Sequence, residues 1–169
     1  MPSLARLRSI VAVALQITVL ALLALAFAFR APQVSGPSME PAIAPGEFVL
    51  INTLTYRLGP VARGDIIAFR HAAPLPAVYL KRVIGLPGDE ISIEHGKVQV
   101  NGKHLAEPYV RFSDDRSYPT ATVPPQAFYV LGDNRVSSDD SRAWGFVSRE
   151  DVVGKAVFVL WPPGQLGKL

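Results

Sequence analysis

Residues 90–102, EISIEHGKVQVNG, decide the fold class of this chain. Isoleucine and valine alternate with polar residues on both sides of His95-Gly96. Successive side chains of a strand point to opposite faces, so a period of two is typical of strands that bury one face. Asn101-Gly102 is a strong hairpin-turn dipeptide. The stretch therefore predicts antiparallel strands joined by tight turns.

Short apolar runs separated by turn residues extend this pattern in both directions. The expected strands cover residues 48–51, 66–69, 79–84, 128–131 and 152–160. They predict a mostly β, antiparallel domain over residues 31–169, with a smaller hairpin and loop subdomain at 89–131. Residues 113–125 contain three prolines and two aspartates, and we expect them to form an exposed loop.

The first thirty residues have a different composition. Ile10 to Phe29 carries no charge, and twenty helical residues reach roughly 30 Å, the thickness of a bilayer's hydrocarbon core. Arg6 and Arg8 precede the apolar run and Arg30 alone follows it, which places the N-terminus in the cytoplasm by the positive-inside rule. Residues 1–30 thus predict a cytoplasmic tip and a single-pass anchor in the plasma (inner) membrane. Membrane lipid is one expected partner, and residues 31–169 should lie on the outer face.

A cleavable secretory signal is the alternative interpretation of this segment. Ala24-Leu25-Ala26 resembles a small-x-small cleavage site. A removable signal has an apolar core of about 7 to 15 residues, and this run is longer. The length favours the anchor.

Composition excludes several function classes. The chain has no cysteine, which removes thiol catalysis, disulfides and thiolate metal sites. It has 17 basic and 14 acidic residues; three arginines lie within residues 1–30, so 17 less 3 leaves 14 of each sign beyond them. A formally neutral domain predicts no nucleic-acid partner. The three histidines are far apart in the sequence, and we expect neither a metal nor a cofactor.

Three polar segments contain candidate chemistry. They are 35–41 (SGPSMEP), 79–89 (YLKRVIGLPGD) and 132–142 (GDNRVSSDDSR). A serine hydroxyl is a poor nucleophile until a base takes its proton, and Lys81 is the candidate base for Ser38. On a strand Lys81 shares a face with Tyr79, so its amine would be desolvated and its pKa lowered. A solvated lysine on an edge strand is the alternative, since lysine is rarely buried.

The third segment favours the catalytic interpretation. Asp140 and Arg142 can pair with each other, which keeps the carboxylate from restoring the charge of Lys81. Ser138 offers a neutral hydroxyl that can orient the amine. Taken alone, the segment would be a polar turn followed by surface charges. All three segments occur together, in order, after a membrane-length helix.

Together the three segments resemble the signature boxes of the bacterial type I signal peptidases, the membrane-bound serine proteases with a lysine base. The resemblance spans roughly residues 32–161 and implies a partly open antiparallel barrel. It implies Ser38 as nucleophile, Lys81 as base, Ser138 holding the amine, and Asp140 with Arg142 bracing the site. Ser35 is a rival nucleophile, but it lacks the adjoining methionine.

The resemblance also implies a substrate class. Exported preproteins would be cut after small-x-small residues, in apolar subsites lined by Val34, Met39, Ile43, Tyr79 and Leu80. Some members of the family supply a second oxyanion donor from a serine two residues before the nucleophile. Gly36 occupies that position here, so the second donor stays open.

Two other functions remain compatible with the sequence. A non-catalytic, membrane-anchored β domain could bind exported chains as a holdase or assembly factor, without needing Ser38 and Lys81 together. A specialised peptidase of the same clan could act on a single pilus or conjugation substrate. The boxes do not separate this second alternative from general preprotein processing.

Overall fold

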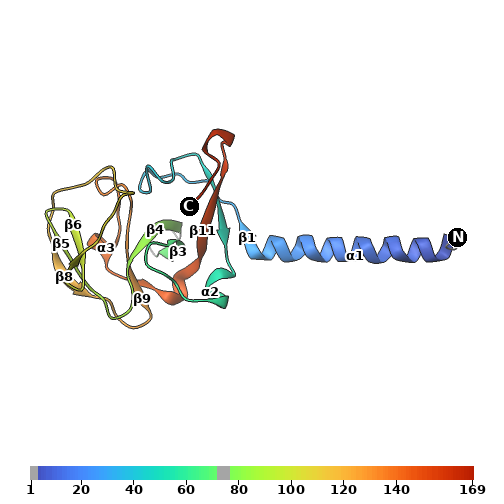
Figure 1. Ribbon diagram of the computed structural model, residues 1–169, viewed down its shortest axis with the longest axis horizontal. Coiled ribbons are helices and arrows are strands. Elements are labelled where there is room, and N and C mark those ends of the chain that lie inside the picture. Colours follow the sequence, from blue (N-terminus) through green and yellow to red (C-terminus); the bar gives the residue numbers. More distant parts are fainter. Residues whose placement is uncertain (1–3, 72–76) are drawn as a thin grey trace.

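The computed structural model, which describes residues 4–71 and 77–169, consists of one long N-terminal helix followed by a β domain (Figure 1). Helix α1 (Leu4–Ala28) lies outside the β domain, and nearly all of its described side chains are exposed. Its segment Arg8–Ala28 is long and apolar enough to cross a membrane. The helix ends one residue before the expected apolar run does. The first three residues of the expected cytoplasmic tip lie outside the described residues.

The end of α1 is hydrogen-bonded to the β domain. Strand β1 (Phe29–Arg30) follows the helix directly and pairs antiparallel with β2 (Phe48–Asn52). The backbone N–H of Thr53 donates to the carbonyl oxygen of Ala28 at 2.9 Å. The Thr53 hydroxyl donates to the carbonyl of Phe27 at 3.0 Å. The last carbonyls of a helix have no partner within the helix, and Thr53 satisfies two of them.

The larger sheet contains eight strands, all paired antiparallel. Its remaining members are β3 (Ile66–His71), β4 (Ala77–Gly85), β9 (Ala127–Leu131), β10 (Val147–Ser148), β11 (Val152–Trp161) and β12 (Gly167–Lys168). The strand order is β1-β2-β11-β3-β4-β9-β10, and β12 pairs with β11. The short helices are α2 (Thr55–Leu58), α3 (Ser141–Trp144) and the 3₁₀ turns η1 (Arg149–Asp151) and η2 (Pro163–Gln165). The sheet curls into a half-barrel, which confirms the predicted fold class (Figure 1).

A smaller sheet lies at the other side of the domain from α1 (Figure 1). It contains β5 (Glu90–Glu94), β6 (Lys97–Val100), β7 (Lys103–His104) and β8 (Tyr118–Thr122) in the order β7-β6-β5-β8. The alternating side chains of β5 and β6 bury one face, as the sequence predicts, and pack against β9.

The prediction of an exposed loop over residues 113–125 is wrong in part, because β8 lies within that range. Strand β8 pairs with β5 at the edge of the smaller sheet. The pairing shifts by one residue between Tyr118 and Ala121, where Pro119 lies. Proline cannot donate to a ladder and is tolerated at edge strands and bulges, and this position combines both.

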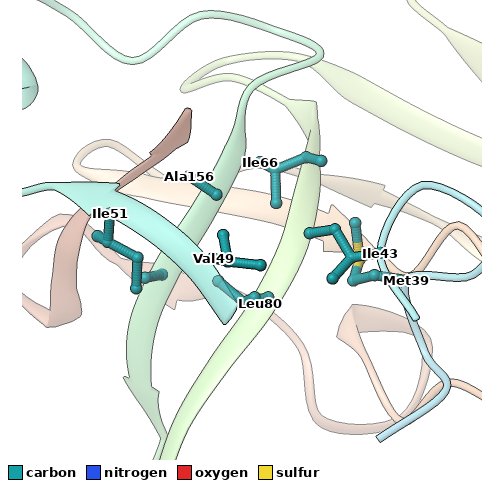
Figure 2. Packing of buried hydrophobic residues seen from close by; sticks show 8 residues of the cluster. Met39, Ile43, Val49, Ile51, Ile66, Leu80 and Ala156 are labelled. Carbon is teal, nitrogen blue, oxygen red and sulfur yellow. The ribbon is translucent and has the colours of Figure 1, made fainter. Parts of the chain in front are cut away.

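The core of the larger sheet also positions the loop that precedes β2. Met39 and Ile43, from this loop, pack with side chains of β2, β3, β4 and β11. Figure 2 shows the two side chains next to each other at one end of the cluster. Ile43 has no exposed surface and Met39 almost none. Burying the two side chains contributes about 2 kcal/mol each, which anchors the residue between Pro37 and Met39 on the sheet.

Candidate active site

Ser38 lies in a tight turn whose position is fixed from two sides. On one side, Met39 is buried in the core. On the other, the Ser38 carbonyl oxygen accepts a hydrogen bond of 3.0 Å from the backbone N–H of Asn134, which follows β9. The loop before β2 and the turn after β9 are therefore joined at the serine.

Lys81 lies on β4, and its Nζ is 2.7 Å from the Ser38 Oγ. Every residue of β3 pairs with a residue of β4, whereas β9 pairs with β4 only from Arg82 onward. The Ser38 turn lies against Lys81, which is the residue of β4 immediately before the segment that pairs with β9. Lys81 is only 3% exposed, so the alternative of a solvated edge-strand lysine is wrong.

Burial changes the acidity of this amine. Desolvation lowers the pKa of Lys81 to about 8, from the 10.5 of an exposed lysine. The carboxylates of Asp140 and Asp139 oppose this change, while Arg142 supports it. At a pKa of 8, about one amine in ten is neutral at pH 7 and able to accept a proton.

Asp140 and Arg142 form a buried ion pair beside the site. Two guanidinium nitrogens of Arg142 donate to the two carboxylate oxygens of Asp140, at 2.8 and 2.9 Å. Asp140 also accepts from the backbone N–H of Gly132 at 3.0 Å and caps α3. Burial by itself raises the pKa of Asp140, but the bonds from Arg142 outweigh it and keep the carboxyl below its usual range. The pair therefore stays charged and joins α3 to β9.

Ser138 lies in the same turn, but its Oγ does not hydrogen-bond Lys81. This Oγ is buried and forms no well-aligned hydrogen bond among residues 4–71 and 77–169, although it helps to lower the pKa of the neighbouring Asp140 carboxyl. Its neighbour is Gly132: a Cβ added there would lie 2.2 Å from the Ser138 Oγ and 2.5 Å from the Ser38 carbonyl oxygen. Only glycine fits between the two serines without moving one of them.

Gly132, Asn134 and the ion pair of Arg82 with Asp133 were not singled out from the sequence. Asp133 has no exposed surface and accepts two hydrogen bonds from Arg82, at 2.8 and 2.6 Å. Arg82 follows Lys81, so this pair holds β4 against the turn after β9. Gly132, Asp133 and Asn134 lie within segment 132–142, whose serines and charges point to the site. The glycine that starts this segment is the sequence signal for the close approach of the two serines.

A cleft of about 340 Å³ is lined by Ser38 and Lys81. Its lining includes four of the five residues expected at the subsites, namely Val34, Met39, Tyr79 and Leu80, together with Ser35, Ser137 and Asp139. Ile43 does not line the cleft, because it packs one layer deeper, beside Met39. The site thus combines a serine, a desolvated amine and a mainly apolar groove, which is the chemistry of a serine hydrolase with an amine base.

Comparison with known proteins identifies the family. Residues 7–161 match the model of the family described as "Signal peptidase, peptidase S26". The chain is 41% identical over 150 residues to "Signal peptidase I" of Bacillus caldolyticus, covering 80% of this chain and 81% of that one. It is 37% identical over 158 residues to "Signal peptidase I" of Leptolyngbya laminosa, covering 89% and 78% of the two chains.

A solved structure is also similar. The crystal structure of a signal peptidase I from Enterococcus faecalis V583 is 34% identical, with a TM-score of 0.49 over 61% of this chain and 98% of that one. The family match and the relatives show that the chain belongs to the signal peptidase family, peptidase S26. It is a peptidase that removes signal peptides from preproteins, and the non-catalytic alternative is wrong.

Proposed function

We propose that Ser38 and Lys81 form the catalytic dyad of this signal peptidase. One observation carries the assignment: a serine Oγ lies 2.7 Å from an amine that is desolvated, and both line a mainly apolar cleft of about 340 Å³. Neutral Lys81 accepts the hydroxyl proton as Ser38 attacks the scissile carbonyl. The resulting ammonium gives that proton to the leaving amine. A water molecule then hydrolyses the ester, with Lys81 again taking the proton.

The surrounding residues support the dyad. The Ser38 backbone N–H donates to no acceptor among the described residues, and it can stabilise the oxyanion. Asp140 and Arg142 brace the turn that carries Ser138. The buried Oγ of Ser138 is assigned to accept from the protonated amine. Its place against Gly132, which contacts the Ser38 carbonyl, supports this assignment.

The substrate binds as an extended strand beside β4. Among the described residues, β9 leaves the segment of β4 before Arg82 unpaired on the side that faces the cleft. A peptide that adds here gains backbone hydrogen bonds, and its alternate side chains enter the groove. Val34, Met39, Tyr79 and Leu80 line subsites that suit small residues, consistent with cleavage after small-x-small sequences. Ile43 acts from behind, by packing under Met39.

We infer a single-pass topology in the plasma (inner) membrane. Residues 1–30 form the cytoplasmic tip and anchor, residues 31–169 the catalytic domain on the outer face, and the smaller sheet a subdomain within 89–131. The length of the apolar segment Arg8–Ala28 and the excess of arginine before it support this orientation. In this topology the groove lies near the membrane surface. The apolar core of a signal peptide lies in the same membrane, so its cleavage site comes close to the groove.

Cleavage of a purified preprotein in detergent tests the dyad. We expect Ser38→Ala and Lys81→Ala each to lower cleavage by about 10⁴-fold while the fold is retained. Ser35→Ala, which changes another serine of the cleft, and Lys97→Ala, on the exposed β5–β6 hairpin, are the matched controls and should retain activity. Full activity of either dyad variant would remove that residue from the mechanism. Loss of activity in Ser35→Ala would reassign the nucleophile.

A further inference from the structure

A second cavity, of about 420 Å³, lies at the junction of helix and β domain. Four arginines line it: Arg30 of β1, Arg57 of α2, Arg70 of β3 and Arg149 of η1. The other lining residues are Phe27, Thr53, Tyr56, Val61, Val78, Val152 and Val153, and no carboxylate is among them. Segments far apart in the sequence thus bring four positive charges around one cavity.

None of these four arginines forms an ion pair with a described acidic residue, although Glu150 and Asp151 follow Arg149 in the chain. By contrast, Arg82, Arg135 and Arg142 each bind a carboxylate. Four arginines that line one cavity without an ion pair repel each other, and an oxyanion bound between them would offset that repulsion.

The remaining polar groups of the cavity are already engaged. The Thr53 hydroxyl donates to the carbonyls of Phe27 and Ala28, and the Tyr56 hydroxyl donates to Asp65. The guanidinium groups are therefore the donors available to a ligand. Guanidinium presents paired N–H groups that match the oxygens of a phosphate. The donor set favours a phosphate-type anion over a neutral or cationic ligand.

The position of the cavity indicates where that phosphate comes from. Phe27 belongs to the last turn of α1, and α2 lies next to this end of the helix (Figure 1). Leu58 of α2 and Phe27 are both more than four-fifths exposed, so apolar surface adjoins the arginines. With α1 across the bilayer, as in the proposed topology, this cavity lies at the level of the headgroups. A basic cleft with apolar walls at that level suits a lipid with an anionic head.

We propose that this cavity binds the phosphate group of an anionic phospholipid of the membrane that holds α1. The inference rests on the proposed topology but not on the catalytic dyad. The signal peptide is not the occupant, because its basic N-terminal region and its apolar core offer no anionic group to the arginines. The cavity adjoins the catalytic cleft, since Val78 lines both. A bound lipid therefore contacts the β4 rim over which the substrate enters.

Thermal unfolding of the full chain in zwitterionic detergent tests the site without any substrate. Short-chain phosphatidylglycerol is titrated against phosphatidylcholine and against inorganic phosphate, and the Ser38→Ala background removes any contribution from turnover. We expect saturating phosphatidylglycerol to raise the Tm by about 5 °C, since a ligand that binds only the folded state stabilises it. Phosphatidylcholine should leave the Tm unchanged, and inorganic phosphate should act only at much higher concentration.

The variants decide whether the arginines are responsible. Arg57 and Arg149 are both exposed and lie outside the catalytic groove. The double variant Arg57→Gln/Arg149→Gln should raise the phosphatidylglycerol concentration that gives half of the Tm shift by at least about tenfold. The matched control combines Arg111→Gln with Lys97→Gln, which removes two exposed charges elsewhere. An unchanged response in the cavity pair, or an equal loss in the control pair, would overturn the site. Saturation by inorganic phosphate at the same concentration as the lipid would overturn the lipid assignment.

Discussion

Replacing Lys81 by methionine should stabilise this protein while abolishing its activity. Methionine has nearly the length of lysine and no charge, so Lys81→Met keeps the volume of the side chain and removes the ammonium group. The Nζ of Lys81 is buried beside Ser38, where the charged form is poorly solvated. The fold therefore bears a desolvation cost that the variant does not have.

The size of this cost follows from the pKa of Lys81. The value drops from 10.5 to about 8 on folding, and each unit corresponds to 1.36 kcal/mol, so the charged amine costs the fold about 3 kcal/mol. The unfolded chain binds the extra proton between pH 8 and 10.5, so wild-type stability rises with pH across that window. Below pH 8 the cost is fully present, and above about 10.5 it disappears. The Lys81→Met variant also loses the hydrogen bond to Ser38, which lowers its free energy of unfolding by about 1 kcal/mol at every pH.

Denaturant unfolding in detergent at pH 6.5, 8 and 10.5 measures the difference directly. We expect Lys81→Met to be more stable than wild type by about 2 kcal/mol at pH 6.5, with the advantage lost by pH 10.5. Lys97→Met is the control, because an exposed ammonium stays hydrated in the folded chain. A variant that is less stable than wild type at pH 6.5, or a difference that does not change with pH, would refute the desolvated amine.

Three further outcomes follow from the site. With Lys81 as base and its pKa near 8, kcat/KM for a peptide substrate should rise about tenfold per pH unit up to that pH and then level off; a flat profile from pH 6 to 9 would exclude this base. Gly132→Ala should lower cleavage by at least about 100-fold, because its Cβ meets both serines, whereas Gly164→Ala, where a Cβ meets open space, should be neutral in the same assay. Arg82→Met leaves the carboxylate of Asp133 buried and unpaired, and it should cost about 3 to 5 kcal/mol in denaturant unfolding; retention of wild-type stability would show that the pair is not structural.

The alternation of apolar and polar residues predicted most of the fold, because it records which face of each strand is buried. All five additional runs expected as strands are strands in the structure. Strand β8 escaped prediction because its signal is weak. Pro119 normally argues against a strand, and only the partner strand shows that it occupies a bulge at an edge.

The sequence indicated which residue types the site needs but not how they are held. Ser38 and Lys81 are 43 positions apart, and their contact depends on the Asn134 bond and on the packing of Met39. The sequence also suggested that Ser138 orients the amine, yet its Oγ makes no bond to Lys81 here. Local sequence cannot supply such contacts, because they arise from segments that meet only after folding.

The cluster of four arginines shows the same limit for charge. Beyond residue 30 the chain is formally neutral, and no segment contains a run of basic residues. Neutrality of the whole domain nevertheless conceals a local excess, because α2, β3 and η1 each contribute one of its arginines to the same cavity, where they meet Arg30 of β1. Charge totals describe a domain, whereas binding depends on how charges are distributed over its surface.

The direct passage from α1 into β1 couples the orientation of the helix to that of the enzyme. No flexible linker separates Ala28 from Phe29, and Thr53 binds the last carbonyls of the helix. Spanning helices tilt more in thin bilayers than in thick ones. With α1 across the bilayer, as proposed, each change of tilt rotates the catalytic domain and shifts the height of Ser38 above the lipid. In that topology, the reach of this peptidase along its substrate is a joint property of the protein and of the thickness of its membrane.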